Sequence, residues 1–116
     1  MSSGTSDTET QATRIDDEIS SRELLYQAVG HRGGDDVAIA ARDLTSGEIV
    51  RIRFLDESES REMQVSEDIP LGHKLALKSI PGGEKVTEYG RLIGRATSEI
   101  REGSHVHVHN LKSLRW

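Results

Sequence analysis

Three histidines alternate with valines in the run GSHVHVHNL, close to the C-terminal end of the sequence. Alternate side chains of a strand share a face, so a strand here would place His105, His107 and His109 on one side and both valines in the core. Neutral imidazole suits Zn, Fe, Mn or Ni, and two histidines at this spacing can share one ion. The pattern permits metal ligation by His107 and His109. It equally permits a solvent-facing strand, and no carboxylate ligand stands nearby in the sequence.

A second candidate is the tripeptide Gly72-His73-Lys74, which follows a proline-containing turn. Histidine can transfer protons near neutral pH, and lysine can bind a carboxylate. Polar residues are also ordinary in turns, so the pattern fits a solvated turn as well. The three residues alone leave both interpretations open.

Other polar residues are weaker candidates. Tyr89 precedes a glycine, and its hydroxyl can donate to a ligand, although a tyrosine in so aromatic-poor a sequence is more often part of the core. His31, Asp35 and Asp36 lie in a glycine-rich stretch, where aspartate usually serves the backbone of a turn. No pair of a nucleophile and a base, and no paired carboxylates, can be assembled from the sequence.

The composition bounds the possible functions. The chain has 116 residues, enough for one domain, and its one Trp, two Tyr and one Phe leave the core to Val, Ile, Leu and Ala. A net charge of −5 argues against nucleic-acid binding, and the absence of cysteine excludes thiolate metal sites. With no apolar run long enough for a membrane span and no secretory leader, we expect a cytoplasmic protein without membrane contacts.

The sequence divides into a polar segment, residues 1–20, and a domain at 21–116. The first segment has almost no apolar residues, so we expect a disordered tail. Near the domain start, Ser20 and Glu23 have capping-box spacing and Gly30 can end a helix, whereas Leu24 to Val29 also fits a strand. From Asp36 onward short alternating stretches are separated by glycine turns, which predicts an all-β barrel or an irregular small β fold.

Several motifs resemble a known family. The stretches GHKLAL, YG, IG followed by Ala96, and GSHVHVHN occur in the same order as in the N-terminal domain of altronate and galactarate dehydratases, a member of the SAF group of small β-clip domains. The stretch DDVAIAARDLTSGEIV is similar to the opening segment of that domain. The resemblance runs from about Leu24 to Ser113. It implies a mostly β, SAF-type β-clip fold, and it favours a strand over a helix at Leu24 to Val29.

The resemblance also implies an activity. The dehydratases remove water from sugar acids to give 2-keto-3-deoxy acids, using a divalent metal, most often Fe(II), with Mn(II) or Mg(II) as alternatives. Their large catalytic domain follows the small one. This chain therefore resembles a separate small subunit that acts with a large subunit, which is expected to bind most of the metal.

The resemblance suggests roles for individual residues. His73 and Lys74 are expected to transfer protons or bind the substrate carboxylate. His107, His109, Asn110 and Tyr89 are expected to contact substrate, with His107 and His109 also as metal ligands, while His105 is a weaker candidate.

The sequence departs from the family pattern at two places, and the first, which changes a charge next to a candidate site, puts the substrate in question. Glu88 replaces a usual lysine, and Asp35–Asp36 replaces an Asp-Asn pair. Two alternative functions remain. The chain is also similar to the small subunit of sulfolactate sulfo-lyase, and the same scaffold occurs in non-catalytic binding modules.

Overall fold

The structure is a computed structural model that describes residues 25–113, and between these limits the chain forms strands and no complete helical turn. The expectation of a mostly β fold is therefore confirmed. The predicted tail at residues 1–20 lies outside the described part. The strands are β1 (Ala28–Gly30), β2 (Val37–Ala40), β3 (Ile49–Phe54), β4 (Arg61–Gln64), β5 (Lys74–Ala76), β6 (Lys85–Glu88), β7 (Arg91–Ala96), β8 (His105–Val106) and β9 (Leu111–Ser113).

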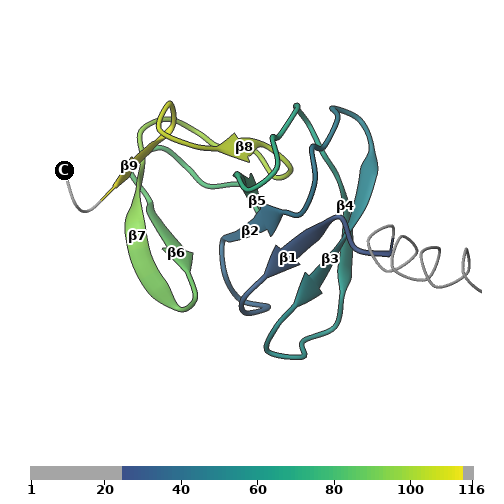
Figure 1. Cartoon of the computed structure of the whole chain (residues 1–116). Coiled ribbons are helices and arrows are strands. Elements are labelled where there is room, and N and C mark those ends of the chain that lie inside the picture. Colours follow the sequence, from purple (N-terminus) through teal and green to yellow (C-terminus); the bar gives the residue numbers. More distant parts are fainter. Residues whose placement is uncertain (1–24, 114–116) are drawn as a thin grey trace, which may run out of the picture.

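The strands form two sheets (Figure 1). The larger sheet has the order β4-β3-β1-β2-β5-β8, and the smaller has the order β6-β7-β9. All neighbouring strands are antiparallel except β1 and β3, which are parallel. Because β8 pairs with β5 alone, it forms one edge of the larger sheet, and that edge carries the first of the alternating histidines.

The disputed segment near the domain start ends in a strand, since Ala28 and Val29 belong to β1, whereas residues 25–27 lie outside it. β1 lies between β2 and β3, with Ala28 opposite Ala40 on one side and Ile52 on the other. A helix here would leave the facing backbone groups of both neighbours without partners, which explains why tertiary pairing overrides the local capping pattern. The strand begins at Ala28, later than predicted, and Leu24 lies outside the described residues.

The core consists of two clusters that meet along β2 and β5. The first cluster contains Ala28, Ala38, Ala40, Leu44, Val50, Ile52, Phe54, Met63, Val65, Ile69, Leu75 and Leu77. The second contains Val37, Ala76, Ile80, Val86, Ala96, Ile100 and Val106. Successive residues of β2 and β5 point into different clusters, so both faces of these strands are buried. The second cluster fastens the smaller sheet to the larger one and holds β8 at its edge through Val106.

The strand predicted over all three alternating histidines is wrong beyond Val106. β8 ends at Val106, and residues 107–110 form a turn. Val106 is buried as predicted, but Val108 is 73% exposed. The physical cause is Asn110, whose side chain binds the backbone on both sides of the turn and closes it, as described below. The part of the chain that the structure describes contains no helix long and apolar enough to cross a membrane.

Candidate metal and substrate site

Pairing of β5 with β8 brings two distant histidine segments together. In the register of this pair, Lys74 lies opposite Val106 and Leu75 opposite His105. One step further along the same register, His73 meets His107, and their ring centroids lie 4.3 Å apart in a stacked arrangement. His73 Nδ1 lies 2.8 Å from His105 Nε2, a hydrogen-bond distance. The two motifs singled out in the sequence therefore form one cluster.

Local backbone geometry fixes the approach of each segment. The amide of His73 donates to the Pro70 carbonyl at 3.0 Å, which closes the turn before β5. Before β8, Gly103 has a φ of 86° and lies against the carbonyl oxygen of Gln64, with which any Cβ would collide. Glycine is needed there because both the left-handed backbone and the close approach exclude a side chain.

Asn110 holds the turn that follows β8. It is 7% exposed, its Oδ1 accepts the His107 amide at 2.9 Å, and its Nδ2 donates to the His105 carbonyl at 2.8 Å. Both polar ends of the side chain are thus occupied by the backbone of the histidine segment. The structure gives Asn110 a positioning role, and its predicted contact with substrate stays a prediction.

The surroundings of His105 and His107 favour neutral rings. Burial lowers the pKa of His105, and the neighbouring His73 adds to this effect. The pKa of His107 is also lowered, first by partial desolvation and then by the same neighbour. Closely spaced imidazoles resist becoming charged together, because like charges repel in a partly desolvated site. Neutral imidazole is the form that ligates metals.

The cluster fits a divalent transition metal. His73, His105 and His107 each offer a ring nitrogen, and these atoms lie within 4.8 Å of one another. Three imidazoles are a common protein ligand set for Zn and related ions and suit iron, whereas Mg²⁺ prefers oxygen ligands. The prediction paired His107 with His109 as ligands of one ion, but the structure places them in different candidate ligand sets. Among residues 25–113, no set of three ligands contains both histidines. The turn after Val106 separates them.

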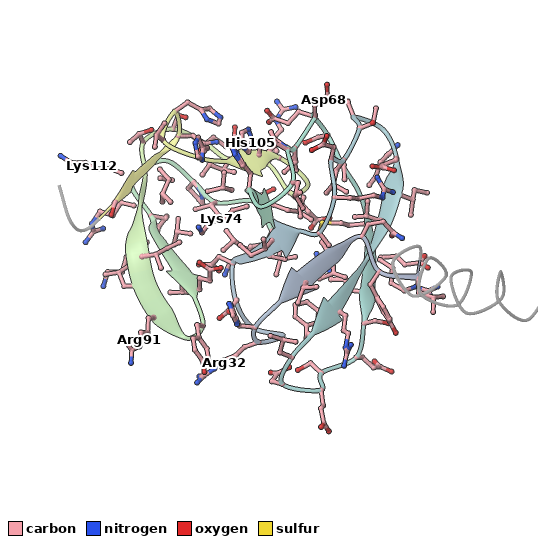
Figure 2. The ribbon with its side chains drawn as sticks, viewed as in Figure 1. Arg32, Asp68, Lys74, Arg91, His105 and Lys112 are labelled. Atoms are coloured by element: carbon pink, nitrogen blue, oxygen red, sulfur yellow. The ribbon has the colours of Figure 1, made fainter. Side chains whose placement is uncertain are left out.

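Lys74 points from β5 toward the smaller sheet, as Figure 2 shows. Its Nζ lies 3.7 Å from Glu88 Oε1 on β6, and the Glu88 side chain is 15% exposed. The residue that departs from the family pattern therefore faces the predicted carboxylate-binding lysine. A pair at this distance lacks a tight hydrogen bond, so a competing carboxylate can displace it.

Tyr89 lies apart from the histidines. Its ring stacks on His31 with centroids 4.7 Å apart and packs near the Arg32 guanidinium, and Figure 2 shows Arg32 at the opposite end of the molecule from His105. Tyr89 is 58% exposed, so the core interpretation is wrong. The structure does not bring Tyr89 to the cluster, and its role in substrate binding stays a prediction without support from this geometry.

Asp35 and Asp36 form a buried polar junction between the two sheets. Asp35 accepts hydrogen bonds from the amides of Tyr89 and Gly90 at 2.6 and 3.0 Å. Asp36 Oδ2 accepts the Thr87 amide at 2.7 Å, and Lys78 Nζ lies 2.8 Å from Asp36 Oδ1. The predicted structural role is confirmed, although the bonds reach a distant hairpin rather than the local turn.

One candidate ligand beside the cluster could not be predicted from the sequence. The carboxylate of Glu67 lies with the ring nitrogens of His105 and His109, within 4.8 Å of both. Glu67 sits in a polar stretch far in sequence from His105 and His109, and no spacing rule connects it to them. Only the topology of the folded sheet shows that Glu67 lies beside these histidines.

The geometry defines a small β domain that carries a histidine site on a sheet edge. Residues 26–114 match the family model for the altronate/galactarate dehydratase SAF domain. The chain belongs to this family, as the motifs in its sequence suggested.

Relatives divide into short and long proteins. The chain is 36% identical over 89 residues to (2R)-sulfolactate sulfo-lyase subunit alpha of Chromohalobacter salexigens, covering 76% of this chain and 95% of that subunit. It is 43% identical over 61 residues to the same-named subunit of Paracoccus pantotrophus, covering 53% of this chain and 90% of the subunit. It is 40% identical over 79 residues to altronate dehydratase of Bacillus subtilis, covering 68% of this chain but 15% of that enzyme.

Proposed function

We propose that this chain is the small subunit of a metal-dependent sugar-acid lyase of the altronate/galactarate dehydratase type. It acts with a separate large catalytic subunit to eliminate water from an aldonic or aldaric acid. The observation that carries the proposal is the convergence of His73, His105 and His107 at an exposed sheet edge, close to Lys74. The names of the relatives support both the lyase activity and the division into subunits.

The reaction breaks two bonds of the substrate. A base takes the proton from the carbon next to the carboxylate, and the hydroxyl group on the following carbon leaves with a proton as water. The resulting enol tautomerises to the 2-keto-3-deoxy acid. A divalent ion, Fe(II) or in its place Mn(II) or Mg(II), supplies Lewis-acid polarisation of substrate oxygens when bound. His105 and His107 would contribute ligands, beside those of the large subunit.

Residues of this chain have separate tasks in the proposal. Lys74 binds the substrate carboxylate, displacing its long contact with Glu88. His73, whose Nδ1 lies 2.8 Å from His105 Nε2, accepts the proton at a ring nitrogen. His109, exposed on the turn, contacts substrate hydroxyl groups. Asn110 keeps this turn in place through its two backbone contacts.

A sulfo-lyase small subunit is the second candidate. The observation that favours it is the match to nearly the whole sulfolactate sulfo-lyase subunit alpha. In this alternative the proton is removed in the same way, but sulfite leaves instead of hydroxide. A non-catalytic binding module is the third possibility, and loss of all turnover would favour it.

Purification from the native host tests the proposal. The tagged chain is captured and the eluate assayed with sugar acids and sulfolactate, in the presence of Fe(II), Mn(II) or Mg(II). We expect a large partner to co-purify and a keto acid to form from a sugar acid. Release of sulfite from sulfolactate would favour the second candidate. A chain that elutes alone and turns over no acid would contradict both.

Substitution of the lysine tests the assigned site in that complex. K74M should raise the KM for substrate at least tenfold, because the carboxylate loses its cationic partner. K85M is the matched control, since Lys85 is an exposed lysine on β6. Equal kinetics of K74M and wild type would remove Lys74 from the site.

A further inference from the structure

We propose a second metal position, formed by Glu67, His105 and His109, which overlaps the first through His105. The carboxylate and ring nitrogens of these residues lie within 4.8 Å of one another. The ring centroids of His105 and His109 are 5.2 Å apart. The position is distinct from the cluster of His73, His105 and His107, because two of its three ligands, Glu67 and His109, do not belong to that cluster.

Hydrogen bonds outside the site hold Glu67 next to His105. The amide of Ser66 donates to the Gly103 carbonyl at 2.9 Å. The hydroxyl groups of Ser66 and Ser104 lie 2.9 Å apart. Ser66 precedes Glu67 and Ser104 precedes His105, so these bonds hold the two ligand-bearing segments together. These bonds fix the backbone of Glu67 next to that of His105.

The turn after β8 holds His109. The amides of Asn110 and Leu111 donate to the His107 carbonyl at 3.0 and 2.9 Å, and the Asn110 side chain spans the turn. These bonds fix the distance between the backbones of His105 and His109. Glu67 and His109 are exposed, so their side chains can rotate onto an ion while the part-buried His105 serves as the fixed ligand.

Two imidazoles and one carboxylate form a ligand set typical of open zinc sites. Metal–ligand distances of about 2.0–2.2 Å require the three donor atoms to draw together, a movement that the two exposed side chains allow. The set suits Zn²⁺ or Co²⁺ better than Mg²⁺, which prefers oxygen.

The shared histidine links the two positions. A neutral imidazole has one nitrogen free for a metal, since the other carries the proton. His105 can therefore serve one ion at a time, and the two ligand sets compete for it. We infer that the chain binds one tightly held transition-metal ion, which has two alternative positions.

Titration of the full chain, carrying no polyhistidine tag, tests the inference without a partner subunit or substrate. Zn²⁺ binding is measured by calorimetry, and Co²⁺ binding by its visible absorption. We expect H107A, which disables the first set, to keep one ion with an affinity within about tenfold of wild type. H107A/E67Q should lose at least a further tenfold, and H105A, which removes the shared ligand, should bind about 10- to 100-fold more weakly than wild type.

H107A/E99Q is the matched control, because Glu99 is an exposed glutamate outside the cluster. Unchanged thermal melting confirms that each variant is folded. Loss of all binding in H107A would overturn the inference, as would equal affinities of H107A and H107A/E67Q. Because these titrations need no turnover, their outcome is independent of the proposed lyase activity.

Discussion

Two polar clusters of this domain differ in where their hydrogen bonds go. At the Asp35–Asp36 junction, the carboxylates are buried and accept bonds from backbone amides and from Lys78. In the histidine cluster, the rings of His73 and His105 bond to each other. The carboxylates of the first cluster join the two sheets, whereas the imidazoles of the second keep nitrogen atoms available for a ligand.

The difference separates groups that serve the fold from groups that serve a site. A buried carboxylate is tolerated when donors surround it, and its removal then disturbs every donor. Partly exposed imidazoles that face one another add little to stability, since water can replace either partner. Among residues 25–113 no buried side-chain nitrogen or oxygen lacks a partner, so the cluster is not a defect of packing.

The largest expected effect on stability is that of D36A. The substitution removes the acceptor of the Thr87 amide and the partner of Lys78, and it should lower the free energy of unfolding by about 2–4 kcal/mol. Urea denaturation measures this change. E59A is the control at an exposed site and should stay within about 0.5 kcal/mol of wild type. A D36A variant as stable as E59A would break the comparison.

H105A should show the opposite pattern. Zn²⁺ affinity should fall by about 10- to 100-fold, because both ligand sets lose their shared member. The free energy of unfolding should change by less than about 1 kcal/mol, since the ring is only partly buried. Parallel calorimetry and urea denaturation give both values. If H105A were as destabilising as D36A, the histidine would belong to the fold rather than to a site.

N110A tests a residue that serves both the fold and the candidate site. Loss of its two backbone hydrogen bonds should cost about 1–2 kcal/mol of stability. The loosened turn should also weaken Zn²⁺ binding, because His107 and His109 lose their fixed spacing. N110D keeps one acceptor and should recover part of both losses. Full metal affinity in N110A would show that the turn does not position the ligands.

The smallest effect is a dependence of stability on pH. Because the pKa of His105 in the folded chain lies below its ordinary value of 6.5, the unfolded chain binds protons more readily as pH falls. This contribution to stability is present above about pH 6.5 and is lost as pH falls through the depressed folded pKa. Urea midpoints at pH 7.5 and 5.5 should differ more for wild type than for H105N. An equal difference would assign the pH dependence to other groups.

The sequence predicted the class of fold because short alternating stretches and glycine turns carry local information. The residue at which a strand ends was harder to predict. Val108 continues the alternation that predicts a strand, yet Asn110 ends the strand by binding the backbone on both sides of the turn. A single side chain thus overrides a period-two pattern, and spacing alone does not reveal it.

The candidate site was predictable in part. The two histidine motifs could be found from residue types, but their meeting depends on the register of β5 against β8. Glu67 could not be found, because serine bonds from another segment bring it to His105. Tyr89 was a weaker candidate in the sequence, and the fold places it on another face with His31.

The most direct test of the account is the turnover of sugar acids by the purified two-chain complex containing H105A. The account predicts that H105A still co-purifies with the large subunit and that keto-acid formation falls at least tenfold at saturating metal. An H105A complex as active as wild type would contradict the account, because the histidine cluster would then have no part in the reaction.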